Sequence, residues 1–154
     1  MGIASIIEWL GREASCGVNP KLTMTAVQIL ELSNRGDARG FSFSLPPEAL
    51  AFVGPTADIH IVAAKPGAVR GNHCHSQWRE ALMILPGSKW SLHWDDGEGS
   101  ATQHREFSGD GAVLVLVPPG AAHAVRNDGS GDLWMVAVSS EPYNPSETVK
   151  RKLI

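Results

Sequence analysis

Short apolar segments, each ended by a turn-forming pair, recur between residues 58 and 139, and this pattern limits the possible folds more than any other feature of the sequence. The segments are rich in β-branched and aliphatic residues, and Pro-Gly, Asp-Gly and Ser-Gly pairs separate them, as is typical of strands joined by tight turns. The expected strands are Asp58–Ala64, Val69–His75, Glu80–Leu85, Lys89–Trp94, Gln103–Phe107, Ala112–Val117, His123–Arg126 and Leu133–Ser139. This array predicts an all-β sandwich or barrel with mostly antiparallel pairing.

The two ends of the chain are less regular. The expected elements there are a short helix over 4–12, a strand over 23–32, a half-buried strand at Phe41 and Phe43, and a helical turn over 47–52. A chain of 154 residues is long enough for one domain with a self-sufficient core. We therefore expect an N-terminal extension with the first strands (1–56), a barrel core (57–140) and a C-terminal tail with a solvated basic end (141–154), all in one domain.

Charge and composition limit the partners. A formal net charge of −3 disfavours nucleic acid, which usually binds a basic face. The longest uncharged apolar run, 111–124, is too short to span a bilayer. The cysteines, Cys16 and Cys74, are expected to be free thiols of a reducing compartment, because a core of this size needs no disulfide bond for stability. We expect a cytoplasmic protein that binds a small molecule and neither nucleic acid nor membrane.

Three histidines and a glutamate fall into two compact motifs. His73 and His75 are two residues apart on an expected strand, so their side chains leave the same face, opposite Cys74. Glu80 opens the next strand and can return a carboxylate to that face, and His123 lies at the mouth of another hairpin. A lone histidine on a strand is usually a packing residue, but these four occur together. Three imidazoles and a carboxylate predict one divalent transition metal ion (Zn, Fe, Mn or Ni), with a position left for substrate.

Both motifs resemble those of the cupin family. The segment 67–87 has the spacing of the first cupin motif at every fixed position, and the segment 118–127 is similar to the second. The opening glycine of the second motif, Gly111, lies one residue further from Pro118 than is usual. The resemblance implies a double-stranded β-helix, or jelly-roll barrel, with a short N-terminal helical extension. It also implies a set of metal ligands, which are His73, His75, Glu80 and His123.

Three further segments resemble carbohydrate cupins. The segment 70–73 is similar to the Arg-Gly-x-His stretch of nucleotide-sugar epimerases, and 37–41 is similar to the start of dTDP-4-dehydrorhamnose 3,5-epimerase. The segment 141–145 resembles the ends of capsular-sugar cupins. The resemblance implies an epimerase or isomerase of polysaccharide biosynthesis, in the metal-bearing branch because the ligand set is complete. In such an enzyme the metal polarises a keto group and a base moves the neighbouring proton.

Five other residues are candidates for this chemistry. His60 and His93, on neighbouring expected strands, are candidate bases, and Tyr143 is a candidate acid. Arg70 offers a fork for a phosphate or carboxylate, and Trp78 offers a ring for stacking. Each has an alternative structural role. For His93, the neighbouring tryptophans and leucine of its strand would take the inward face instead.

Two functions of other classes remain open at this stage. An Fe(II)- or Mn-dependent oxygenase would use the same open metal site, and a non-catalytic module would bind a small molecule without turnover. Jelly-roll domains also leave sheet edges exposed, and pairing of two copies is a common way to cover them. We therefore expect a homodimer.

Overall fold

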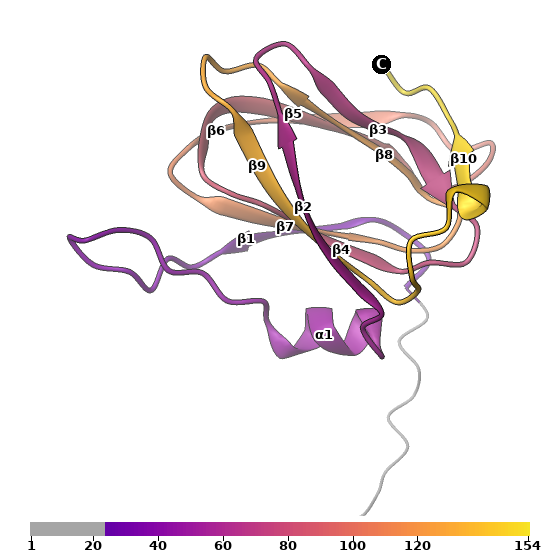
Figure 1. Ribbon diagram of the computed structural model, residues 1–154. Helices are drawn as coiled ribbons and strands as arrows, with labels where there is room; N and C mark the ends of the chain where they lie inside the picture. The colour runs from indigo at the N-terminus through magenta and orange to yellow at the C-terminus, as the bar shows by residue number, and fades with distance from the viewer. Residues whose placement is uncertain (1–23) are drawn as a thin grey trace, which may run out of the picture.

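The computed structural model describes residues 24–154, which form two antiparallel sheets packed face to face (Figure 1). The strands are β1 (Gln28–Leu32), β2 (Asp58–Ala64), β3 (Val69–His75), β4 (Glu80–Ile84), β5 (Gly87–Asp95), β6 (Gln103–Gly109), β7 (Ala112–Val117), β8 (Ala122–Asn127), β9 (Leu133–Ser139) and β10 (Thr148–Lys150). The helix α1 (Pro47–Val53) and the 3-10 turn η1 (Pro145–Glu147) complete the elements. The expected all-β architecture is confirmed. The helix expected over 4–12, and Cys16, lie outside the described residues.

The strands enter the two sheets in an interleaved order. One sheet has the order β1-β7-β4-β9-β2 and the other has the order β10-β3-β8-β5-β6. From β2 to β5 and from β6 to β10, successive strands alternate between the sheets, which is the connectivity of a jelly roll. Strands β2, β3, β7 and β9 have the bounds that the sequence predicts. The connections between these strands therefore cross from one sheet to the other, and the cavity described below lies between the two sheets.

The apolar core lies between the sheets, and a second layer covers part of one outer face. Trp90 and Leu92 of β5 pack in the inner core against Met135 of β9. On the outer face of the other sheet, Phe52 of α1 packs against Leu114 of β7. All six residues of β7 are buried because the inner core covers one face of this strand and α1 covers the other. A strand covered on both faces is continuously apolar, and this accounts for the run Ala112–Val117.

The prediction of a strand at Phe41 and Phe43 is wrong. This segment is an extended loop without a neighbouring strand, and the Phe41 side chain is 57% exposed. The Asn34 Oδ1 atom accepts hydrogen bonds from the backbone N–H groups of Gly36 (2.8 Å) and Ser42 (2.9 Å) and so closes the loop locally. Phenylalanine and serine residues do alternate in this segment, but no strand lies beside it to form hydrogen bonds with it. The first strand is also shorter than predicted and begins at Gln28.

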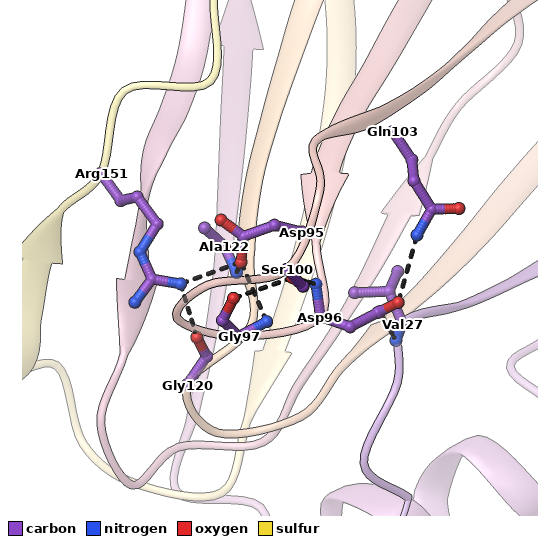
Figure 2. A network of polar contacts seen from close by, with 9 residues as sticks. All are labelled: Val27, Asp95, Asp96, Gly97, Ser100, Gln103, Gly120, Ala122 and Arg151. Atoms are coloured by element: carbon purple, nitrogen blue, oxygen red, sulfur yellow. Dashed lines mark hydrogen bonds and ion pairs between the residues drawn. The ribbon is translucent and has the colours of Figure 1, made fainter.

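The C-terminal segment packs against the barrel, although Lys150 and Lys152 of its basic end are exposed as expected and Arg151 is half-buried. Strand β10 pairs with β3, so that Thr148 lies opposite His75 and Lys150 lies opposite His73. Beyond β10, the Arg151 Nη1 atom donates hydrogen bonds to Asp95 Oδ1 (2.9 Å) and to the Gly120 carbonyl (3.0 Å), as Figure 2 shows. The last residues of the segment bind Asn72, whose Oδ1 atom accepts from the backbone N–H of Leu153 (2.9 Å). The segment thus forms part of the wall around the histidine strand. No helix among residues 24–154 is long and apolar enough to cross a membrane.

Candidate active site

A cavity of about 400 Å³ lies between the two sheets. Its size is within the range of small-molecule sites, about 300–1,000 Å³. Strands β2, β4 and β9 form one wall, and strands β3, β8 and β10 form the other. The lining residues are His60, Val62, Val69, Arg70, Gly71, His73, His75, Trp78, Glu80, Leu82, His123, Val125, Met135, Ala137, Tyr143 and Thr148. All four predicted metal ligands are brought together here.

The histidine cluster depends on an irregularity in β3. His73 lies directly opposite His123 of β8, and the register shifts by one residue between Gly71 and His73. Asn72 absorbs this bulge with a left-handed φ of 60°. Gly71 has a φ of 89°, and a Cβ atom at this position would come within 2.5 Å of the His123 carbonyl oxygen. The Arg-Gly-Asn-His stretch therefore has a local structural reason, since only glycine permits this approach of β3 to β8.

The three imidazoles and the carboxylate form one compact group. The ring centroid of His73 lies 4.8 Å from that of His75 and 4.9 Å from that of His123. The Glu80 Oε2 atom of the opposite sheet lies 3.3 Å from His123 Nε2. Oε2 has no hydrogen-bond partner within residues 24–154, and the Nδ1 atoms of His75 and His123 also have none there. The nitrogen–oxygen contact is thus a close approach without hydrogen-bond geometry.

Burial sets the protonation of this group. Desolvation lowers the pKa of His73 and of His123 to about 4, and it lowers that of His75 to about 3, where the neighbouring histidines add to the effect. Desolvation raises the pKa of the Glu80 carboxyl. The imidazoles are therefore neutral at neutral pH, and a neutral imidazole is both a proton acceptor and a metal ligand.

A second acid–base pair lies on the other wall. His60 and Asp58 are two residues apart on β2, and the His60 Nδ1 atom lies 2.8 Å from Asp58 Oδ2. Both side chains keep access to solvent, with exposed fractions of 42% for His60 and 30% for Asp58. The sequence analysis selected His60 but not Asp58. The period of two along the strand, which puts both residues on one face, is the signal that could have found it.

The predicted substrate-binding residues also lie at the cavity. The Arg70 Nε atom donates to the Ala63 carbonyl (3.0 Å), which holds this exposed guanidinium at the cavity mouth. Trp78 is buried and stacks on His75, with ring centroids 4.4 Å apart, so it packs against the cluster and forms part of the wall. Tyr143 lies at the rim with its ring 6.3 Å from that of Trp78, and it is 68% exposed.

The structure does not place His93 in the cavity, where the sequence analysis expected a candidate base. Its strand neighbours Trp90, Leu92 and Trp94 pack in the inner core, so His93 is on the outer face of its sheet and not in the cavity. Its ring stacks on that of His104 at 5.6 Å. The structure therefore gives His93 no contact with the candidate site. Thr148, in contrast, lines the cavity and was missed, because β10 is too short to be predicted from its three residues.

The donor set fits a divalent cation chemically. It contains three neutral imidazoles and a buried carboxylate oxygen without a hydrogen-bond partner, and both are groups that bind such ions. In the part of the chain that the structure describes, however, no three or more His, Cys, Asp or Glu side chains already have the geometry of a metal site. The four-ligand centre therefore stays a prediction.

The interleaved sheets and the histidine–glutamate cluster define a cupin of the RmlC-like class, as the motif spacing predicts. Residues 47–149 match the model of the polysaccharide biosynthesis C-terminal domain. The chain belongs to this family.

Comparisons with individual proteins agree with this assignment. Spore coat polysaccharide biosynthesis protein SpsL of Bacillus subtilis (strain 168) is 22% identical in an alignment 131 residues long, and the alignment covers 82% of this chain and 87% of SpsL. The sugar 3,4-ketoisomerase QdtA of Thermoanaerobacterium thermosaccharolyticum, solved with TDP, superposes with a TM-score of 0.64 at 13% identity and covers 82% of this chain and 88% of its own. NovW, a 4-keto-6-deoxy sugar epimerase of Streptomyces spheroides, superposes with a TM-score of 0.66 at 18% identity, over 82% of this chain and 69% of its own. At these identities the solved structures establish the shared fold.

Proposed function

We propose that this protein is an isomerase or epimerase of a nucleotide-linked keto sugar in polysaccharide biosynthesis. The observation that carries the proposal is the buried group of neutral imidazoles beside a carboxyl group in an open cavity. The names of the relatives support it: SpsL belongs to polysaccharide biosynthesis, and a QdtA variant was solved with TDP-4-keto-6-deoxyglucose.

The cavity supports one orientation of such a substrate. The exposed guanidinium of Arg70 at the mouth offers donors for a diphosphate. Tyr143 at the rim offers a ring for the base or sugar. The sugar would then reach inward to the cluster, between the apolar side chains of Val62 and Met135.

The proposed reaction requires these residues to move one proton. The hydrogen on a carbon next to a ketone is acidic, and a neutral imidazole of His73 or His75 can accept it, which leaves an enolate. The Glu80 carboxyl, with its raised pKa, can donate a hydrogen bond to the enolate oxygen. Return of the proton to a carbon restores a ketone, so the reaction neither consumes nor releases electrons.

We propose as an alternative state of this cluster that it binds a divalent metal ion; its histidines are then ligands and no longer proton acceptors, and His60, which lines the cavity outside the cluster, is the base. His73, His75, Glu80 and His123 would hold the ion, which when bound would polarise the keto oxygen as a Lewis acid. The support is the partnerless, buried Glu80 Oε2 atom. Metal analysis of the protein purified without added metal tests this: near-stoichiometric metal that is lost in His75→Ala supports it. Metal content that is unchanged in the variant, or no metal in either protein, contradicts it.

The activity is tested with TDP-4-keto-6-deoxyglucose in D₂O. We expect deuterium at a carbon next to the keto group and a new keto sugar, both detected by NMR, and we expect His73→Asn to lose them. His104→Asn is the matched control, because His104 is exposed and does not line the cavity. Oxygen consumption without exchange would favour the oxygenase. Binding of TDP without any exchange would favour the non-catalytic module.

A further inference from the structure

Strand β10 places one side chain in the wall of the cavity that the proposed reaction does not use. Thr148 lies directly opposite His75 of β3, and both residues line the cavity. Directly opposed residues of paired strands project from the same face of a sheet, so the Thr148 side chain lies beside the histidine cluster. Thr148 is therefore next to the region where the sugar of the proposed substrate would lie.

The backbone on both sides of Thr148 is held by hydrogen bonds. The Thr148 N–H donates to the Pro145 carbonyl of η1, and the Ser76 N–H donates to the carbonyl of the preceding residue, Glu147 (3.4 Å). After β10, the Arg151 N–H donates to the carbonyl of Asn72 (2.9 Å). A side chain on a backbone fixed in this way is positioned before a ligand binds, as binding residues require.

The Thr148 hydroxyl is buried and has no hydrogen-bond partner within residues 24–154. The other described side-chain atoms in this condition, His75 Nδ1, Glu80 Oε2 and His123 Nδ1, all belong to the predicted ligands. A buried polar group without a partner costs free energy, and native chains rarely keep one. Valine has nearly the same shape and would avoid this cost, so the hydroxyl indicates a partner from outside the chain.

The hydroxyl can be presented to a ligand by rotation about one bond. Thr148 carries a methyl group and a hydroxyl on the same Cβ atom, and rotation about χ1 between staggered positions exchanges them. Aliphatic side chains make up much of the lining outside the cluster, namely those of Val62, Leu82, Val125 and Met135. A sugar hydroxyl that enters this apolar region needs a hydrogen-bond partner, and Thr148 supplies one.

We infer that Thr148 is a specificity-determining residue whose hydroxyl forms a hydrogen bond with a ring hydroxyl of the sugar near the reacting carbon. This inference rests on the proposed function and narrows its substrate class to keto sugars that keep a free hydroxyl on C2 or C3. A threonine hydroxyl both donates and accepts, so it can pair with the sugar hydroxyl in either direction. A sugar that lacks this hydroxyl leaves Thr148 without a partner in the complex, and sites with such polar groups discriminate strongly against deoxy analogues.

The experiment combines removal of the Thr148 hydroxyl with removal of a hydroxyl from the substrate. Deuterium exchange in D₂O is followed by NMR for TDP-4-keto-6-deoxyglucose and for its 2-deoxy and 3-deoxy counterparts. We expect the wild-type protein to have a kcat/KM about 10–100-fold lower for one of the two deoxy sugars, and Thr148→Val to show a similar loss on the parent sugar. On the sensitive deoxy sugar, Thr148→Val should cost less than threefold, because the hydrogen bond is already absent there.

Two further variants and one measurement without turnover complete the test. Thr148→Ser keeps the hydroxyl and should stay within threefold of wild type on all three sugars. Thr102→Val removes the hydroxyl of an exposed threonine outside the cavity and should change none of the values. The melting temperature of ligand-free Thr148→Val should not fall, because the hydroxyl that is removed has no partner to lose.

Several outcomes would overturn the inference while the proposed function stands. They are equal kcat/KM values of the wild-type protein for the three sugars, a Thr148→Val variant within threefold of wild type on the parent sugar, and losses that multiply when the variant meets the sensitive deoxy sugar. A melting temperature of ligand-free Thr148→Val lower by more than about 4 °C would show that the hydroxyl has a structural role instead. No exchange of any of the three sugars by the wild-type protein would refute the proposed function, and the inference with it.

Discussion

Arg151 should stabilise the domain far more than a terminal arginine usually does. Its Nη1 atom binds the Asp95 carboxylate and the Gly120 carbonyl at once, and the two charged side chains are only 26% and 7% exposed. A hydrogen bond to a charged group contributes about 1.5–3 kcal/mol, and a fully exposed ion pair contributes about 0–1 kcal/mol. The intermediate exposure of this pair places the cost of Arg151→Ala at about 2 kcal/mol.

Two further hydrogen bonds to Asp95 limit this cost. Asp95 Oδ1 also accepts from the backbone N–H groups of Gly97 (3.0 Å) and Ala122 (3.2 Å), so the carboxylate is not left alone when the arginine is removed (Figure 2). The loss should therefore stay below the about 3–5 kcal/mol that accompanies a broken, fully buried pair. For a chain of this length, 2 kcal/mol corresponds to a fall in melting temperature of about 4–8 °C.

The assay is urea unfolding at fixed protein concentration, with Asp95→Asn and the double variant to complete a cycle. We expect a coupling energy of about 1–2 kcal/mol between Arg151 and Asp95. Lys152→Ala is the matched control, because its side chain is exposed, and it should change stability by less than about 0.5 kcal/mol. A loss below 0.5 kcal/mol in Arg151→Ala, with no coupling, would refute the view that this ion pair fixes the C-terminal segment.

Three further predictions follow from the burial and contacts of other residues. The pKa of His123 is lowered to about 4 by burial, so between pH 6.5 and about 4 the unfolded chain binds more protons there, and the free energy of unfolding should fall on acidification by up to about 1.4 kcal/mol per pH unit. His73 and His75, whose pKa values are also lowered, act in the same direction, and the raised pKa of Glu80 acts in the opposite one, so urea unfolding should show lower stability at pH 5 than at pH 7. Equal stability would contradict the prediction. Asn127 is 2% exposed, donates to the carbonyls of Ala64 (2.8 Å) and Gly131 (2.7 Å) and accepts from the Gly129 N–H (2.9 Å), so Asn127→Ala should cost about 3 kcal/mol and Asn127→Asp more, in the same assay. Ile61 is 68% exposed on an edge strand, so Ile61→Lys should convert the expected homodimer into a monomer in sedimentation velocity; a wild-type monomer would refute the dimer, and a dimeric variant would place the interface elsewhere.

The barrel strands were predictable because their signals are local. Strands such as β2 and β7 carry their own alternation or apolar run and are closed by Gly- or Pro-containing turns. Strand β10 has three residues, and its existence depends on pairing with β3, which no local pattern encodes. Phe41 and Phe43 show the reverse case, because their alternation is local but no strand lies beside them.

The candidate site, like the fold, was predictable where the sequence signal is local. The motif spacing was enough to bring together the cluster around His73, since neighbouring strands of a jelly roll impose it. His60 and His93 were equivalent on the sequence, and only the packing of the tryptophans beside His93 separates them. The Asp58 partner of His60 was missed because a carboxylate at the start of a strand is usually solvated.

Strand β2 carries two incompatible sets of side chains on its alternate positions. His60, hydrogen-bonded to Asp58, lines the cavity, and Ile59 and Ile61 face outward. A substitution in this strand changes one face only, but inserting or deleting one residue would move the isoleucines to the cavity side and His60 to the outer side. Changes in chain length near β2 must therefore be absorbed in the loop that follows α1 or in the turn before β3. During divergence of the family, this strand is expected to vary in residue type while its length stays fixed.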